Sequence, residues 1–127
     1  MFAYIMIGTN DRERANAFYD GLMAELDMQR FMDFGHISFY GKELGQPFLG
    51  VCSPLDKNDA TIGNGSMVAL AAGTPENVDR IYNKAIELGG TCEGEPGVRP
   101  AGFYCAYFRD PDGNKFNACC PAPSKGE

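Results

Sequence analysis

Residues 4–22, YIMIGTNDRERANAFYDGL, decide the fold of this chain. An apolar stretch opens the segment. Asn10 follows as a predicted N-cap, and Glu13 three residues later completes a capping box. Apolar residues then recur at helical spacing. They are Ala15, Phe18, Tyr19, Leu22 and Leu26. The pattern predicts a strand near the N-terminus and then a helix over about residues 11–25.

The same pattern returns 63 residues later, because Tyr4 to Ile7 fall on Met67 to Leu70 (67 − 4 = 63). Thr74 is a predicted cap with Pro75 at the first helical position, and Gly89 follows the last turn. The apolar positions coincide in four pairs: Ala15/Val78, Phe18/Ile81, Tyr19/Tyr82 and Leu22/Ala85. The sequence therefore predicts a second helix over about residues 75–88 and a tandem repeat.

Three further strands are predicted after each helix. They span about residues 27–34, 36–41 and 46–52, then 91–96, 102–109 and 114–120. The predicted fold class is α+β, a single domain over residues 1–127 of two tandem βαβββ modules whose mixed sheets form a shared cleft. The modules cover about 1–53 and 64–120, with a linker at 54–63 and a short tail at 121–127.

Composition and charge restrict the partners and the location that we expect for this protein. The 127 residues carry a formal net charge of −6, so we expect no nucleic-acid partner. No apolar run approaches the roughly 20 residues that cross a bilayer, so we expect no membrane partner. The first residues carry no basic segment of a signal peptide. These features predict a cytoplasmic protein.

The cysteines are odd in number and form no CxxC pair. They are Cys52, Cys92, Cys105, Cys119 and Cys120. The prediction for this pattern is reduced thiols that serve mostly as small core residues. A thiol-based metal or catalytic site is the alternative.

Three stretches carry a resemblance to a known family: residues 8–20, residues 63–70 and residues 107–117 with their DPDG turn. Their order and spacing resemble the glyoxalase/bleomycin-resistance/extradiol-dioxygenase (vicinal oxygen chelate) superfamily. The resemblance implies a cleft in which His, Gln or Glu side chains hold a divalent metal. That metal would chelate two substrate oxygens and act as a Lewis acid.

The resemblance also assigns the metal-ligand positions, and these hold Tyr4, Leu49, Met67 and Asn117. Such a set does not suit a divalent transition metal. The chain has one histidine, His36, which we expect in a turn rather than in a catalytic role. The sequence therefore predicts no metal and no other cofactor.

The same resemblance predicts which side chains line the cleft: Tyr4, Met6, Met67, Phe103, Cys105, Tyr107 and Asn117. One interpretation is an apolar pocket with polar groups on two tyrosines and one asparagine, suited to a small, partly aromatic or apolar molecule. The other is that these side chains only pack against one another. Arg99 could reach an anionic ligand, although a solvated loop arginine is the simpler expectation.

Three functions stay open at this point. The leading hypothesis is a metal-free member of the superfamily that binds a small molecule in the cleft. The second is a lactoylglutathione-lyase-like or dioxygenase-like enzyme with an atypical metal or none. The third is a non-catalytic structural or interaction protein. We expect a homodimer, because sheets of this kind would otherwise leave their edge strands unprotected.

Overall fold

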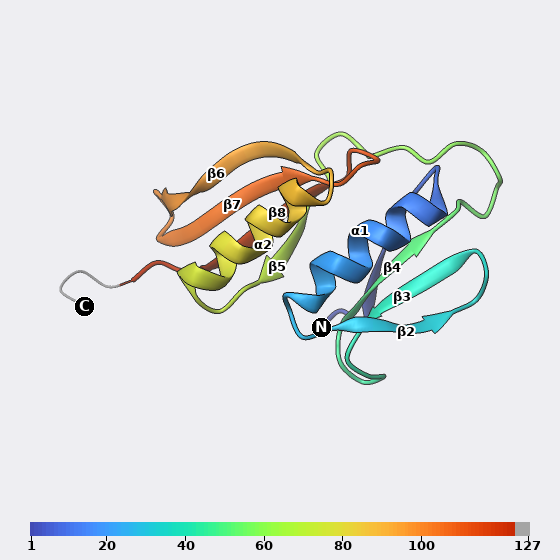
Figure 1. Ribbon diagram of the computed structural model, residues 1–127, viewed down its shortest axis with the longest axis horizontal. Helices are drawn as coiled ribbons and strands as arrows, with labels where there is room; N and C mark the ends of the chain where they lie inside the picture. The colour runs from blue at the N-terminus through green and yellow to red at the C-terminus, as the bar shows by residue number, and fades with distance from the viewer. Residues whose placement is uncertain (124–127) are drawn as a thin grey trace.

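The structure, a computed structural model, describes residues 1–123 and contains two modules of like topology (Figure 1). The first consists of β1 (Tyr4–Gly8), α1 (Arg12–Ala24), β2 (Gln29–Asp33), β3 (Ile37–Gly41) and β4 (Phe48–Cys52). The second consists of β5 (Val68–Ala71), α2 (Pro75–Glu87), β6 (Thr91–Arg99), β7 (Phe103–Arg109) and β8 (Lys115–Pro121). Residues 124–127 of the expected tail lie outside the described residues.

Each module folds into one mixed four-stranded sheet. The strand orders are β1-β4-β3-β2 and β5-β8-β7-β6. The first strand of each module runs parallel to the last, and the other pairs are antiparallel. Each helix packs on its own sheet, and the two helices also contact each other (Figure 1). The predicted fold class of two tandem βαβββ modules is therefore confirmed.

Both helices begin close to where the sequence predicts, but the residue that caps α1 differs from the prediction. Asp11, rather than Asn10, caps α1, and its side chain accepts a hydrogen bond from the Arg14 N–H. The Asn10 side chain bonds instead to the backbone of Ala60 in both directions, so it ties the linker to the first module. Thr74 caps α2 by accepting the Asn77 N–H, with Pro75 at the start of the helix as predicted.

One hydrophobic core extends through both modules. Phe18 of α1 and Ile81 of α2 are both fully buried, as the repeat predicts. Tyr19 of α1 packs its ring against Phe116 of β8, with ring centroids 6.0 Å apart. Burial of these large side chains supplies most of the driving force that joins the modules.

Polar groups also join the modules, where the DPDG turn after β7 meets the start of α1. The Thr9 hydroxyl donates to Asp112 Oδ2 at 2.5 Å, and Arg14 pairs with the same carboxylate at 2.9 Å. The Tyr19 hydroxyl donates to Asp110 Oδ2 at 2.5 Å. We call these five residues the inter-module network. Although Asp112 lies in this turn, its side chain is only 5% exposed, because it packs against the start of α1.

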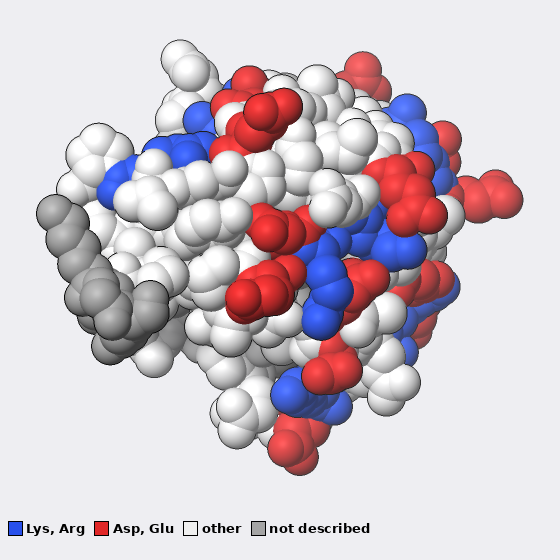
Figure 2. Space-filling model, turned by 60° about the vertical axis from the view of Figure 1, so that its left-hand side comes forward, with Lys and Arg blue, Asp and Glu red and all other residues white. Residues whose placement is uncertain are grey.

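The remaining charges lie mostly on the surface in mixed arrangement. Figure 2 shows acidic and basic side chains side by side on one face. Several form ion pairs, such as Arg30 with Asp20 at 2.7 Å and Lys84 with Glu87 at 3.0 Å. Within residues 1–123, no helix is long and apolar enough to cross a membrane.

Candidate ligand site

The strand registers decide which side chains face the helices and which face away, because residues opposite each other in paired strands point to the same side. In the first sheet, Leu49 and Val51 belong to the core with α1, so their neighbours point away from it. These neighbours are Tyr4, Met6, Phe39, Phe48 and Gly50. We call this side the first open face.

The second sheet follows the same rule. Phe116 and Ala118 pack into the core with α2, so Asn117 and Cys119 point away from it. The register brings Tyr107 opposite Asn117, Cys105 opposite Cys119 and Phe103 opposite Pro121. We call this side the second open face. The structure thus places Phe103, Cys105, Tyr107 and Asn117 together.

The register corrects the position assigned to Leu49. Ile5 pairs with Leu49 as Val68 pairs with Phe116, so Leu49 is the counterpart of a core residue and is itself 7% exposed. Met6 pairs with Gly50 as Ala69 pairs with Asn117. Gly50 is therefore the counterpart of Asn117, and it has no side chain to offer. The connection between β3 and β4 is one residue longer than the connection between β7 and β8, which explains the error.

An aromatic cluster covers the first open face. Tyr4 stacks on Phe48 with centroids 5.0 Å apart, and Phe39 meets both rings edge-on at 5.8 and 5.2 Å. Phe31 and Phe34 extend the cluster. Tyr4 stays 49% exposed and Phe34 61% exposed, so the cluster is open to solvent. Sequence reasoning identified only Tyr4, since the face that a strand phenylalanine takes depends on the register.

The second open face is more polar. Arg99 and Lys115 lie over the Tyr107 ring at 5.5 and 5.6 Å from its centroid. Arg99 ends β6, and its guanidinium donates to the Glu95 carbonyl, so it is a packed strand residue rather than the solvated loop arginine expected. Burial, and then the nearby Cys105 thiol, raise the pKa of Tyr107.

Asn117 is the most unusual residue of this face. It is 8% exposed, and its Oδ1 is buried without a hydrogen-bond partner among the described residues. A buried acceptor without a donor costs about 1–3 kcal/mol. Such an atom in a native fold requires an explanation, and a bound molecule is one.

The two open faces of one chain are not joined, because none of the described strands of one sheet contacts a strand of the other. Tyr4 and Met6 therefore lie on one face, and Phe103, Cys105, Tyr107 and Asn117 on the other. Met67 precedes β5 and lines a separate hollow with the 62–66 loop, Arg109 and Lys115. The seven predicted residues thus do not converge within a single chain.

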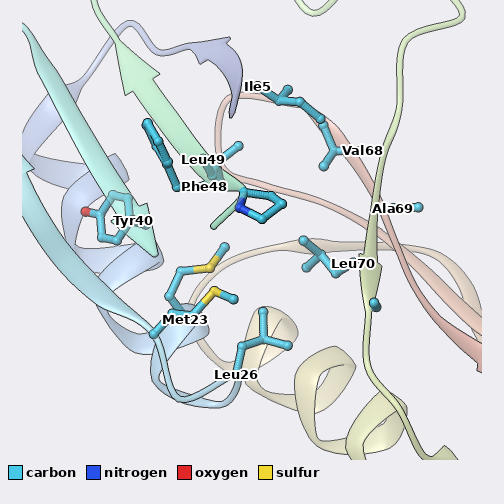
Figure 3. A pocket seen from close by; sticks show the side chains of 12 residues that line it. Ile5, Met23, Leu26, Tyr40, Phe48, Leu49, Val68, Ala69 and Leu70 are labelled. Carbon is cyan, nitrogen blue, oxygen red and sulfur yellow. The ribbon is translucent and has the colours of Figure 1, made fainter. Parts of the chain in front are cut away.

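A pocket does lie between the modules, but other residues line it. It has a volume of about 260 Å³ and opens between β1, β4 and β5 on the helix side of the sheets. Figure 3 shows Ile5, Leu49, Val68 and Leu70 around it, with Met23 and Leu26 from the first module. The Tyr40 hydroxyl at its wall is already bonded to Asn16. The pocket is therefore almost wholly apolar.

The four positions that the resemblance assigns to metal ligands, as corrected, hold few donor groups for a divalent metal. They offer the Tyr4 phenol, nothing at Gly50, the Met67 thioether and the Asn117 amide, and none of these is a strong anionic donor. Within residues 1–123, no three His, Cys, Asp or Glu side chains form a metal-binding group. His36 is exposed in the turn between β2 and β3.

Comparisons with known proteins show the family and agree with the fold. The Glyoxalase/Bleomycin resistance protein/Dioxygenase superfamily profile matches residues 2–118. A glyoxalase/bleomycin resistance protein from Albidiferax ferrireducens T118 is similar, at 37% identity and a TM-score of 0.86, over 94% of this chain and 97% of its own.

More distant structures share the fold. A hypothetical protein, SA1046 from S. aureus, has 26% identity and a TM-score of 0.72 over 94% of this chain and 92% of its own. Lactoylglutathione lyase from Agrobacterium tumefaciens has 19% identity and a TM-score of 0.68, again over 94% and 92%. No sequence among the curated proteins matches the chain.

Proposed function

Since the chain belongs to the glyoxalase/bleomycin resistance protein/dioxygenase superfamily, we propose that it binds a small, flat, partly apolar molecule without the help of a metal. The observation that carries this proposal is the buried, unpartnered Oδ1 of Asn117 beside the Tyr107 ring. A ligand that donates a hydrogen bond to this oxygen would remove the cost of leaving it unsatisfied.

The residues around Asn117 further restrict the kind of ligand that would fit. Tyr107 offers an aromatic ring, and the nearby cations Arg99 and Lys115 favour a ligand with an anionic substituent. The half-exposed Phe103 supplies apolar surface at the end of the same strand. A flat ring with one donor and one negative group matches this combination.

Metal independence rests on the donor set. Holding a divalent ion would require about three strong donors at one point. Tyr4, Met67 and Asn117 offer a neutral phenol, a thioether and an amide, and the fourth position is Gly50. An enzyme in this scaffold would therefore act through an atypical metal or none, and no residue arrangement favours that alternative over binding.

We also propose that the chain forms a homodimer in the cytoplasm. Within residues 1–123, no strand pairs with the outer edges of β1 and β5, and half-exposed apolar side chains lie at both: Tyr4, Met6 and Met67. A second copy would cover this surface and bring further apolar side chains to the ligand. Light scattering at micromolar protein should give twice the 13.8 kDa chain mass; the mass of one chain would refute the homodimer.

The binding proposal can be tested with 8-anilinonaphthalene-1-sulfonate, a flat aromatic anion with an N–H donor whose fluorescence rises in apolar sites. We expect saturable binding that is unchanged after treatment with a chelator. Asn117→Ala should weaken binding about fivefold, the value of one hydrogen bond, while the exposed linker variant Asn58→Ala should not. Asn117→Ala should leave stability unchanged or slightly improved, because it removes an unsatisfied acceptor.

Two results would overturn this proposal. The first is binding that requires added zinc or nickel. The second is binding that survives Asn117→Ala but disappears in Leu70→Trp, which fills the apolar pocket between the modules. That outcome would place the probe in the pocket of Figure 3 instead.

A further inference from the structure

Two cysteines face each other on the second open face. Cys105 of β7 and Cys119 of β8 are direct partners in the antiparallel register, and no bulge interrupts this strand pair. Both are free thiols, Cys105 buried and Cys119 partly exposed. The remaining cysteines are elsewhere: Cys120 points into the core beside α2, Cys92 is exposed on β6 and Cys52 ends β4.

The hydrogen bonds at the two ends of the β7–β8 hairpin show whether Cys105 and Cys119 form a hydrogen-bonded or a non-hydrogen-bonded pair. The Asp110 N–H donates to the Asn114 carbonyl at one end, and the Ala122 N–H donates to the Gly102 carbonyl at the other. Since hydrogen-bonded and non-hydrogen-bonded pairs alternate along an antiparallel ladder, Cys105/Cys119 is a non-hydrogen-bonded pair. The Cys119 carbonyl instead accepts from Ala72 beyond the end of β5.

Non-hydrogen-bonded pairs bring their side chains closest. Their Cα atoms lie roughly 4.5 Å apart, and disulfides occur at Cα separations of about 4.4–6.8 Å. The backbone therefore already holds Cys105 and Cys119 within bonding range, near the short end. A disulfide there would be partly exposed at Cys119, and exposed disulfides are among the easily reduced ones.

We propose that Cys105 and Cys119 form a reversible cross-strand disulfide when the protein meets a peroxide. Cys119, the more exposed thiol, attacks one peroxide oxygen as the thiolate and becomes a sulfenic acid, while the other oxygen leaves as water after protonation. The Cys105 thiolate attacks the sulfenic sulfur, the S–S bond forms and hydroxide leaves as a second water. Two thiols and one hydrogen peroxide thus give one disulfide and two waters.

The environment of Cys119 sets the rate of its reaction with peroxide. Burial, and then the neighbouring Cys105 and Cys120 thiols, raise the pKa of Cys119. Little thiolate is therefore present at neutral pH, and the oxidation rate should rise about tenfold per pH unit below that pKa. The pair therefore stays reduced at neutral pH until peroxide exposure is strong or prolonged.

The test uses the full chain, reduced and freed of reductant, then exposed to hydrogen peroxide. We expect the intact mass to fall by two hydrogen atoms and to recover with dithiothreitol. Peptic digestion at acidic pH, which stops thiol exchange, should locate the link between Cys105 and Cys119. Cys92→Ser and Cys120→Ala should form the same link, whereas Cys119→Ser should not.

Cys105→Ala provides the sharpest comparison, because it leaves Cys119 without a partner. In this variant Cys119 should gain oxygen rather than lose hydrogen. The proposal is wrong if the wild-type chain gains oxygen without forming a link, or links Cys92, Cys52 or a second chain instead. The wild-type digest decides this even if a variant fails to fold, and it does not depend on any ligand.

Discussion

The open faces of the two modules differ at equivalent positions of the same fold. In the first sheet Phe39 faces Gly50, and in the second Tyr107 faces Asn117. At the next pair on the same face, Ile37 lies opposite Cys52 in the first sheet, whereas Cys105 lies opposite Cys119 in the second. One face is therefore aromatic and apolar, and the other carries hydrogen-bonding and thiol chemistry.

The helix-facing positions show no such divergence. Tyr40 and Leu49 of the first sheet correspond to Phe108 and Phe116 of the second, and all four are buried. At these positions both modules thus place large apolar side chains on the side that meets the helices. The side chains on the opposite side of each sheet can differ between the modules, so a functional site can lie there.

The largest expected effect tests whether the aromatic face is structural. Phe39 is 8% exposed and contacts the rings of Tyr4, Phe34 and Phe48, so Phe39→Ala should lower the free energy of unfolding by about 3 kcal/mol. Its counterpart Tyr107 is only half-buried, so Tyr107→Ala should cost about 1 kcal/mol. Urea unfolding measures both, and equal losses would contradict the comparison.

A smaller effect separates the two helix tyrosines. Tyr19 is fully buried and donates to Asp110, so Tyr19→Phe should cost about 2 kcal/mol at neutral pH, the value of a hydrogen bond to a charged group. Its counterpart Tyr82 is half-buried on α2, so Tyr82→Phe should change stability by less than about 0.5 kcal/mol.

Alkaline pH provides a second test of Tyr19. Burial, and then the Asp110 charge, raise the pKa of this tyrosine well above its usual value. A raised folded-state pKa means that the stability is fully present below about pH 10 and is lost as the pH rises further. Tyr19→Phe should therefore lose less stability between pH 8 and pH 11 than the wild type. A steeper loss in the variant would refute this assignment.

The last comparison concerns Gly50, which stands where the second module has Asn117. A Cβ at Gly50 would lie 2.7 Å from the Met6 sulfur and 2.9 Å from the Phe39 ring. Because the Met6 side chain can move, Gly50→Ala should cost only about 1 kcal/mol. Thermal unfolding measures the cost, and an unchanged midpoint would show that the face is looser than its ring contacts indicate.

The sequence predicted the scaffold because its signals are local. The apolar spacing of α1 and α2, the Thr74–Pro75 start and the DPDG turn each depend on neighbouring residues alone. The shift of one residue at the α1 cap, from Asn10 to Asp11, arises from a long-range bond between Asn10 and Ala60.

The site could be predicted only in part, because faces depend on register. A constant repeat offset correctly made Met67 the equivalent of Tyr4. The β3–β4 connection, however, is one residue longer than the β7–β8 connection, so the prediction named Leu49 where the equivalent of Asn117 is Gly50. The aromatic cluster of Phe39 and Phe48 could not be predicted for the same reason. The two rings meet only once their strands are paired in the correct register.

The inter-module network has a consequence for how the chain folds during its synthesis on the ribosome. Thr9 and Asp112, which share a hydrogen bond, are 103 residues apart. At about 5–20 residues per second, on the order of ten seconds pass between their synthesis. Throughout that interval Tyr19 lacks Asp110, the acceptor of its hydroxyl hydrogen bond. A nascent chain that stalls before the final hairpin would therefore hold an unfinished N-terminal half, so the two halves of this repeat reach their stable form together.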